Sequence, residues 1–318
     1  MKALVVGGDG FLGSYFVEQA LNLGHDVTVF DRFPYDRANN LEHVRNKVRF
    51  FPGEFANRVE VVNALEEQDI VYHFISATNP ATSWENPSIE IEENLKYSIQ
   101  LFELAVQNGV KKLVFVSSGG TVYGPQNGII TEEVLPKPFS PYGICKLSIE
   151  HFLNYFHERH HIAADIYRVG NAYGPRQPMQ APQGVIAVWM GKVLRGEALT
   201  VYGDSDTYRD YIYAEDIAYL MTHSLSDLKK SDVYNLGTGR GVSILELLNI
   251  FLSVINEPIQ YQIFPRRGLD NSSVILDSSK LTTFFPEFTF QQLEDKIPET
   301  WAYVRQHHIG NDGKDTGI

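Results

Sequence analysis

Cysteine is almost missing from this chain of 318 residues, since Cys145 is the only one. A single thiol can form neither an intrachain disulfide nor a cysteine-based zinc cluster, and this composition is typical of proteins from reducing compartments. No apolar run reaches the roughly eighteen residues that a membrane-spanning helix needs. The first residues, Met1–Val6, have the character of a buried strand rather than of a signal peptide. We therefore expect a cytoplasmic protein that makes no contact with a membrane.

Positive charge is also scarce, because 27 Lys and Arg residues stand against 39 Asp and Glu residues and the formal net charge is −12. This balance argues against a nucleic-acid partner, although a few local arginines can still hold an anionic ligand. Hydrophobic residues make up 43% of the chain, which excludes a disordered or fibrous protein. The length is enough for one large α/β unit and a smaller lobe.

Short β-branched runs alternate with helix-like stretches in the first half of the sequence. This rhythm predicts a Rossmann-like α/β fold, a doubly wound parallel sheet whose helical crossovers cover both faces. The expected strands are Ala3–Val6, Asp26–Phe30, Val48–Phe51, Ile70–Phe74, Lys112–Val116 and Ala164–Tyr167. The expected helices are Leu12–Leu23, Arg58–Gln68, Ile89–Asn108 and Tyr142–His160.

The rhythm breaks beyond about Gly174, where prolines gather in a loop. We expect an NAD-binding domain over residues 1–173. Residues 174–310 are expected to form mainly a smaller, mixed α/β substrate-binding lobe, with some segments returning to the first domain. Residues 311–318 have the composition of a frayed, flexible tail.

A glycine-rich segment, Gly7-Gly8-Asp9-Gly10-Phe11-Leu12-Gly13, lies between the first expected strand and the first expected helix. Small residues there let the backbone approach a pyrophosphate at the helix N-terminus. The next expected strand is followed by Asp31, whose carboxylate can hold the ribose hydroxyls of adenosine. Its charge would repel the 2′-phosphate of NADP, and neighbouring Arg32 offsets that repulsion only in part. We therefore expect NAD, bound through Gly7, Gly10, Phe11, Leu12, Gly13, Asp31 and Arg32.

Tyr142 and Lys146 stand four residues apart on an expected helix, so both side chains can face one cleft. A tyrosine with a reference pKa of about 10 is a poor base at neutral pH, but an ammonium and a cationic nicotinamide would both stabilise the tyrosinate. Such a pair also occurs on ordinary surface helices. Here it follows a dinucleotide fingerprint, so Tyr142 is predicted to shuttle a proton.

From Leu4 to about Trp301 the chain resembles the extended short-chain dehydrogenase/reductase family, especially its NAD-dependent nucleotide-sugar epimerases and dehydratases of the 4-epimerase type. The matching segments follow one another in order. They are the glycine pattern, Asp31, His73–Ala77, Asn94, Val122–Gly124, Tyr142-x-x-x-Lys146, Arg168–Arg176, Tyr202–Asp204, Arg209–Tyr211, Asp216 and Tyr234–Gly239.

This resemblance implies further contacts to the cofactor and to a nucleotide-sugar substrate. The additional cofactor contacts are Glu54, Phe55, Phe74, Ile75, Ser76, Asn94 and Ser117, with Tyr142 and Lys146 beside them. Asn171, Arg209 and one of Arg266 or Arg267 would grip the substrate diphosphate or nucleoside, because guanidinium groups suit phosphate oxygens.

Two of these arginine assignments have open alternatives. Arg209 could instead form a surface ion pair with Asp206 or Asp210. The family usually has an arginine shortly before a Gly-Asp pair, whereas here the order is Arg266-Arg267-Gly268-Leu269-Asp270. The inserted residue leaves open which of the two arginines makes the contact.

The resemblance implies an epimerase in which Tyr142 takes the proton of the sugar hydroxyl while the C4 hydride passes to NAD and later returns to the other face. Dehydratase and decarboxylase relatives carry an acid where this chain has Gly120 and Thr121, which disfavours elimination chemistry. An NAD(P)H-dependent reductase of a nucleotide-linked 4-keto-6-deoxy sugar stays open, since it needs the same Tyr142 and Lys146. A non-catalytic dinucleotide sensor is opposed by the presence of both residues.

Position 119 departs from the family, which normally has a Ser or Thr there that hydrogen-bonds the sugar oxygen; this chain has Gly119. In an extended segment alternate side chains share a face, so Thr121 is predicted to supply the hydrogen bond. Ser118 is the second candidate and an ordered water the third.

The remaining expectations concern metals and assembly. His160-His161 and His307-His308 lack companion ligands, so we expect no metal site. The resemblance implies a homodimer, in which the helices Ile89–Asn108 and Tyr142–His160 join the subunits through a four-helix bundle.

Overall fold

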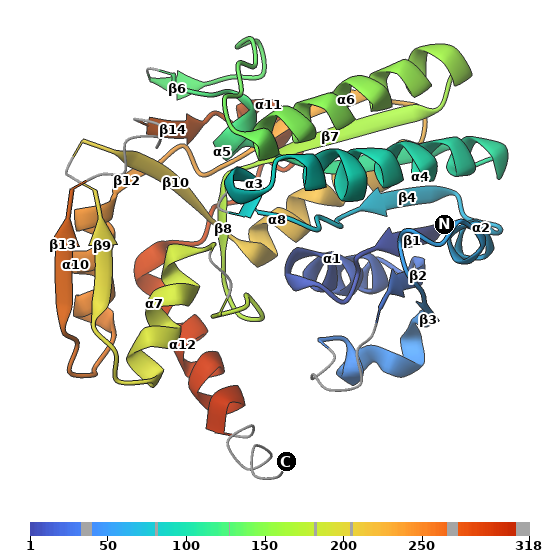
Figure 1. Cartoon of the computed structure of the whole chain (residues 1–318). Helices are drawn as coiled ribbons and strands as arrows, with labels where there is room; N and C mark the ends of the chain where they lie inside the picture. The colour runs from blue at the N-terminus through green and yellow to red at the C-terminus, as the bar shows by residue number, and fades with distance from the viewer. Residues whose placement is uncertain are drawn as a thin grey trace.

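The computed structural model describes residues 1–32, 40–79, 82–126, 128–180, 183–203, 206–265 and 273–309. Its centre is a parallel sheet of seven strands in the order β3-β2-β1-β4-β5-β7-β11 (Figure 1). The strand order reverses between β1 and β4, which is where such sheets bind nucleotides. The strands are β1 (Lys2–Val6), β2 (Asp26–Asp31), β3 (Arg49–Pro52), β4 (Ile70–His73), β5 (Lys112–Ser118), β7 (Ala163–Val169) and β11 (Asp232–Leu236).

Alternating side chains of this sheet enter two separate hydrophobic cores. Ala3 and Val5 of β1 belong to one core, and Leu4 and Val6 to the other. The first core is closed by α1 (Phe11–Asn22), α8 (Ala214–Met221), α9 (His223–Ser226) and α11 (Ser279–Thr282). The second is closed by α2 (Arg58–Leu65), α4 (Lys96–Gln107) and α6 (Pro141–His160). The doubly wound α/β fold expected from the sequence is thereby confirmed.

A second group of elements forms the smaller lobe (Figure 1). Its sheet has the order β12-β10-β14-β6, with β8 paired to β10, and a separate β13-β9 pair lies beside it. The strands are β6 (Ile129–Ile130), β8 (Asn171–Tyr173), β9 (Leu199–Tyr202), β10 (Tyr208–Tyr213), β12 (Gly241–Ser243), β13 (Tyr261–Phe264) and β14 (Ser273–Leu276). A third core joins α7 (Val185–Leu194), α10 (Ile244–Val254) and α12 (Leu293–Ile309).

Short helical pieces complete the described chain. They are the 3-10 turn Glu42–Lys47, α3 (Thr82–Glu85), the π-helical segment Glu90–Leu95 that runs into α4, and α5 (Gly119–Val122). Of the helices that the structure describes, none is both long and apolar enough to cross a membrane.

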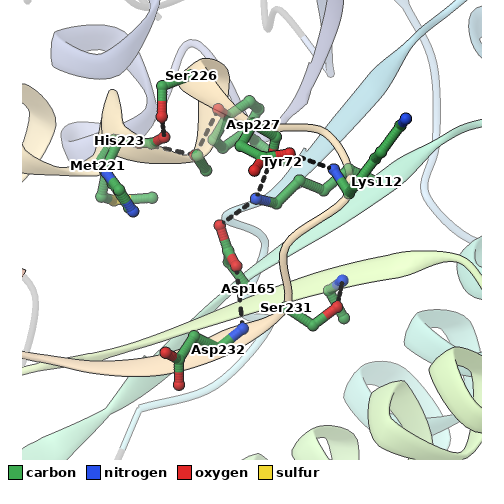
Figure 2. Close-up of polar contacts among 12 residues, drawn as sticks. Tyr72, Lys112, Asp165, Met221, His223, Ser226, Asp227, Ser231 and Asp232 are labelled. Atoms are coloured by element: carbon green, nitrogen blue, oxygen red, sulfur yellow. Dashed lines mark hydrogen bonds and ion pairs between the residues drawn. The ribbon is translucent and has the colours of Figure 1, made fainter.

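A buried polar cluster lies near the amino ends of β5, β7 and β11, away from the carboxyl ends of the strands (Figure 2). Lys112 Nζ lies 2.6 Å from Asp165 Oδ2, and the two side chains are only 2% and 1% exposed. The same ammonium donates to the carbonyl of Asp227 at 2.9 Å, and the backbone N–H of Asp232 donates to Asp165 Oδ1. The cluster therefore joins three neighbouring strands through one buried ion pair.

Candidate active site

A cavity of about 750 Å³ opens where the loops that follow β1, β4, β5 and β7 meet the smaller lobe. This volume lies within the usual range for a small-molecule site. From the predicted residues its lining contains Gly7, Gly10, Phe11, Leu12, Gly13, Phe74, Ser76, Ser117, Ser118, Thr121, Tyr142, Lys146, Asn171 and Arg209. The cavity thus connects the glycine-rich loop, the Tyr-Lys pair and the arginine of the lobe.

The glycine-rich loop has the shape of a phosphate cradle. Gly7 has φ +83°, and a Cβ atom on Gly13 would lie 2.2 Å from the Gly7 carbonyl oxygen, so both positions need glycine. At the start of α1, Gly10 offers no side-chain cap, and the first turn contains no acidic residue. The helix N-terminus therefore presents its backbone N–H groups and positive dipole end to the cavity, which fits a pyrophosphate.

Asp31, the last residue of β2, is held against the glycine-rich loop. Its Oδ2 accepts a hydrogen bond from the backbone N–H of Asp9 at 3.0 Å, and its Oδ1 accepts one from the backbone N–H of Arg32 at 2.8 Å. These bonds fix the carboxylate beside the cradle, although neither Asp31 nor Arg32 belongs to the cavity lining. The position fits the predicted contact to the adenosine ribose.

The Tyr-Lys pair lies on the first turns of α6. The Oγ of Ser140 caps the helix by accepting from Gly143 N at 3.1 Å, and Pro141 occupies the first helical position. Lys146 Nζ donates to the carbonyl of Val116 at 3.1 Å and lies 5.6 Å from the centre of the Tyr142 ring. Both side chains are buried and line the cavity.

Burial opposes the charged form of both members of this pair. It raises the pKa of Tyr142 above its ordinary value, while the nearby hydroxyl of Ser76 lowers it in part. Burial also lowers the pKa of Lys146 to about 8. A bound cation beside Tyr142 would favour the tyrosinate, and an oxidised nicotinamide ring would make this electrostatic contribution.

The segment after β5 differs from the expectation. It is not extended: residues Gly119–Val122 form the short helix α5. Ser118 and Thr121 are then three residues apart on a helical turn, so both can face the cavity that they line. The Thr121 hydroxyl is buried and has no hydrogen-bond partner among the residues described. Thr121 was preferred because the segment was expected to be extended. That expectation was wrong, because the local backbone is helical.

The segment after β4 supplies Phe74 and Ser76 to the cavity. Ile75 packs against the glycine-rich loop, because a Cβ atom on Gly7 would lie 2.9 Å from the Cγ1 of Ile75. Asn94 lies behind the segment and accepts a hydrogen bond from the Ala77 N–H at 2.8 Å. Glu54, Phe55, Ile75 and Asn94 are absent from the cavity lining. The ring of Phe55 packs 5.2 Å from that of His73, centre to centre.

At the lobe end of the cavity lie Asn171 on β8 and Arg209 on β10. The Nδ2 of Asn171 and a guanidinium nitrogen of Arg209 donate to the carbonyls of Asp210 and Tyr208, respectively. The Asp210 carboxylate is buried and accepts four hydrogen bonds, from the Leu276 and Gly239 N–H groups and from the N–H and hydroxyl of Thr238. Arg266 and Arg267 lie outside the described residues.

Several lining residues were missed by sequence reasoning. Trp84 of α3 and Phe139 before α6 both line the cavity, with ring centres 6.2 Å apart. They are 42% and 38% exposed, so both rings are accessible from the cavity. Thr78 also lines the cavity. These three residues lie in loops between an expected strand and an expected helix. For Trp84 and Phe139, an aromatic residue in such a loop was the sequence signal that could have indicated a place in the site.

Comparison with known proteins agrees with this geometry. Residues 3–237 match the model of the NAD dependent epimerase/dehydratase family. The UDP-glucose 4-epimerase of Mycolicibacterium smegmatis is 30% identical over 288 residues, which cover 88% of this chain and 91% of that protein.

Two solved structures share the whole architecture. The structure of the Thermotoga maritima UDP-glucose 4-epimerase with UDP-glucose has a TM-score of 0.87 and 29% sequence identity. The match covers 97% of this chain and 100% of that chain. The Thermus thermophilus UDP-glucose 4-epimerase in complex with NAD has a TM-score of 0.86 and 32% identity, covering 96% and 99%. The resemblance seen in the sequence is confirmed, and the chain belongs to the NAD dependent epimerase/dehydratase family.

Proposed function

We propose that this chain performs 4-epimerisation of a nucleotide sugar with Tyr142 as its proton shuttle. The protein is an NAD-dependent nucleotide-sugar 4-epimerase, an isomerase whose cofactor returns to its starting state in each turnover. The observation that carries the residue assignment is the buried Tyr142–Lys146 pair, which lies in one cavity with the glycine cradle and Arg209. The UDP-glucose of the Thermotoga relative makes a uridine diphosphate hexose the first substrate to test.

When bound in this cavity, NAD would supply reversible hydride-transfer chemistry at the sugar C4, with the hydride returning to the opposite face. Tyr142 takes the proton from the C4 hydroxyl as the hydride leaves and returns it afterwards. Lys146 keeps positive charge near the phenolic oxygen and so stabilises the tyrosinate. Ser118 and Thr121 donate hydrogen bonds to the sugar oxygen. They replace the Ser or Thr hydroxyl that the family normally has at position 119.

The two ends of the cavity divide the ligands between them. The glycine cradle and Asp31 hold the cofactor, with Phe74 and Ser76 on the nicotinamide side. Arg209 and Asn171 hold the substrate, since a diphosphate is anionic and the lining at the lobe end supplies a guanidinium. Residues 1–173 accordingly form mainly the cofactor domain, with β6 and β8 contributing to the sheet of the smaller lobe. Residues 174–310 form mainly the substrate lobe, and α8, α9, β11 and α11 return to the first domain.

The same proposal includes a homodimer that works in the cytoplasm. A row of exposed apolar side chains, Ile144, Phe152 and Tyr155, runs along α6, and Ile91 adds to it from the segment before α4. Exposed apolar rows of this kind favour association with a second apolar surface. The unpaired Cys145 fits a reducing compartment.

Replacing Tyr142 by Phe tests the function, because only the phenolic oxygen is lost. Turnover of UDP-glucose to its C4 epimer, followed by NMR, should fall by at least about a thousandfold, whereas the dissociation constant for NAD should stay within about twofold. Tyr219→Phe is the matched control, since Tyr219 is exposed on α8. Normal turnover in Tyr142→Phe would show that the pair is structural. Stoichiometric consumption of NADH by the unmodified protein would instead favour a reductase.

A further inference from the structure

Glu90 is a buried carboxylate beside the catalytic pair that the proposed reaction does not use. It begins the π-helical segment Glu90–Leu95 and is only 3% exposed. Its Oε1 accepts a hydrogen bond from the hydroxyl of Thr78 at 2.5 Å, and its Oε2 accepts one from the Asn94 amide at 2.8 Å. Its backbone carbonyl accepts from the thiol of Cys145 on α6 at 3.3 Å. One residue thus joins the segment after β4 to α6.

The segment that Glu90 holds forms part of the cavity wall. Ser76 and Thr78 both line the cavity, and the Ser76 hydroxyl donates to the Thr78 carbonyl at 2.9 Å. Asn94 completes the connection, because its amide nitrogen also donates to the Thr78 hydroxyl at 2.8 Å while its oxygen accepts from the Ala77 N–H. Removing the Glu90 carboxylate would leave the Thr78 hydroxyl and the Asn94 amide without their shared acceptor.

The carboxylate of Glu90 forms no ion pair within the part of the chain that the structure describes, and the cation that its charge acts on is Lys146. The other carboxylate near Lys146 is Glu150 on α6, and Arg168 on β7 binds both of its oxygens, the closest at 2.7 Å. His73 on β4 and Cys145 on α6 also face the pair. Burial lowers the pKa of His73 to about 3 and raises that of Cys145 to about 12, so both are neutral at pH 7.

We propose that Glu90 is a positioning residue for the reaction, whose carboxylate fixes the Ser76–Thr78 wall and places a buried negative charge near Tyr142 and Lys146. The proposal rests on the function assigned to that pair. The charge of Glu90 raises the pKa of Tyr142 and that of Lys146. Removing it should lower both pKa values, so the acidic and basic limbs of the kcat profile should move to lower pH together.

The test compares kcat against pH for the unmodified enzyme, Glu90→Gln and Glu92→Gln, with UDP-glucose as substrate and NAD present. Glu92 is the matched control, because it is an exposed glutamate two residues along the same segment. In Glu90→Gln both limbs should move down by about one pH unit, and kcat at the optimum should fall about tenfold because the wall is loosened. In Glu92→Gln neither should change. Unmoved limbs in Glu90→Gln, or an equal shift in Glu92→Gln, would overturn the proposal.

Two more variants separate position from charge and cover poor folding of the amide variant. Glu90→Asp keeps the charge but shortens the side chain, and Thr78→Val removes one hydrogen bond to it. Each of these two variants should lower kcat by about fivefold or more, while the acidic and basic limbs of its kcat profile stay at the pH values of the unmodified enzyme. Full kcat in both variants would contradict the positioning role. Tyr142→Phe is measured alongside. If it stays active, the assignment of Tyr142 fails; if it is inactive and Glu90→Gln keeps its limbs, only the role of Glu90 fails.

Discussion

At position 119 the fold leaves no space for a side chain. A Cβ atom there would lie 2.5 Å from Cδ1 of Leu276 and 3.0 Å from the carbonyl of Arg168. It would therefore point into the hydrophobic contact with β14 and away from the cavity. Because α5 begins at this residue, the hydroxyls that line the cavity come from Ser118 just before it and Thr121 two residues after it.

We therefore expect the hydrogen bond to the sugar oxygen to come from Ser118 and Thr121. Thr121→Val and Ser118→Ala should each lower turnover by about tenfold to a thousandfold, and the double variant should lose more than either single one. The dissociation constant for NAD should hardly change. Single-turnover kinetics with UDP-glucose measure the chemical step directly. Full turnover in both variants would leave an ordered water as the donor.

Asp31 should decide between NAD and NADP, because its carboxylate is already held beside the phosphate cradle by the Asp9 N–H. The unmodified protein should bind NAD more tightly than NADP, and Asp31→Asn should narrow that preference by about tenfold. Isothermal titration gives both dissociation constants. Asp26→Asn is the control, since Asp26 is exposed at the start of the same strand. Tighter binding of NADP by the unmodified protein would contradict this role of Asp31.

At the scale of strands, the buried cluster in Figure 2 should contribute strongly to stability. Lys112→Met leaves the Asp165 carboxylate buried without its ammonium, which should cost about 3–5 kcal/mol of unfolding free energy. Lys111→Met breaks the neighbouring ion pair between Lys111 and Asp69, in which the Lys111 side chain is 61% exposed. It should cost less than about 1 kcal/mol of unfolding free energy. Urea denaturation followed by tryptophan fluorescence measures both changes. Equal losses in the two variants would show that burial of the ion pair is unimportant here.

The strands and long helices of the first half could be predicted because each has enough residues to show its own periodicity. The four residues of α5 are too few for that, and so the segment from Gly119 looked extended. The π-helical segment Glu90–Leu95 is also invisible in the pattern, since the contacts at its first turn come from Thr78 and Cys145 in other parts of the chain.

The site divides in the same way. The glycine cradle and the Tyr142–Lys146 pair each lie within one short stretch of sequence, so their spacing alone predicts them. Glu90, Trp84 and Phe139 join the site only through the folding of separate elements, and a sequence without that fold gives no reason to group them.

For the whole molecule, we expect a homodimer joined through α6 and α4. Light scattering at micromolar concentration should give twice the mass of one chain. Phe152→Glu places a charge in the exposed apolar row of α6 and should yield the monomer. Leu23→Glu changes another exposed apolar residue, which follows α1 on the other face of the central sheet, and should leave the dimer intact. A monomeric mass for the unmodified protein would contradict the proposed assembly.

Because β11 is the edge strand of the central sheet, one edge of β7 stays unpaired during part of protein synthesis. β7 is made halfway through synthesis, but its outer edge pairs with β11, and the chain between them builds β8 to β10 and α7 to α9 first. At roughly 5–20 residues per second, several seconds pass in which the nascent β7 offers an unpaired, apolar strand edge. Chaperones that shield such edges should therefore bind the growing chain in that interval, before the NAD-binding sheet is complete.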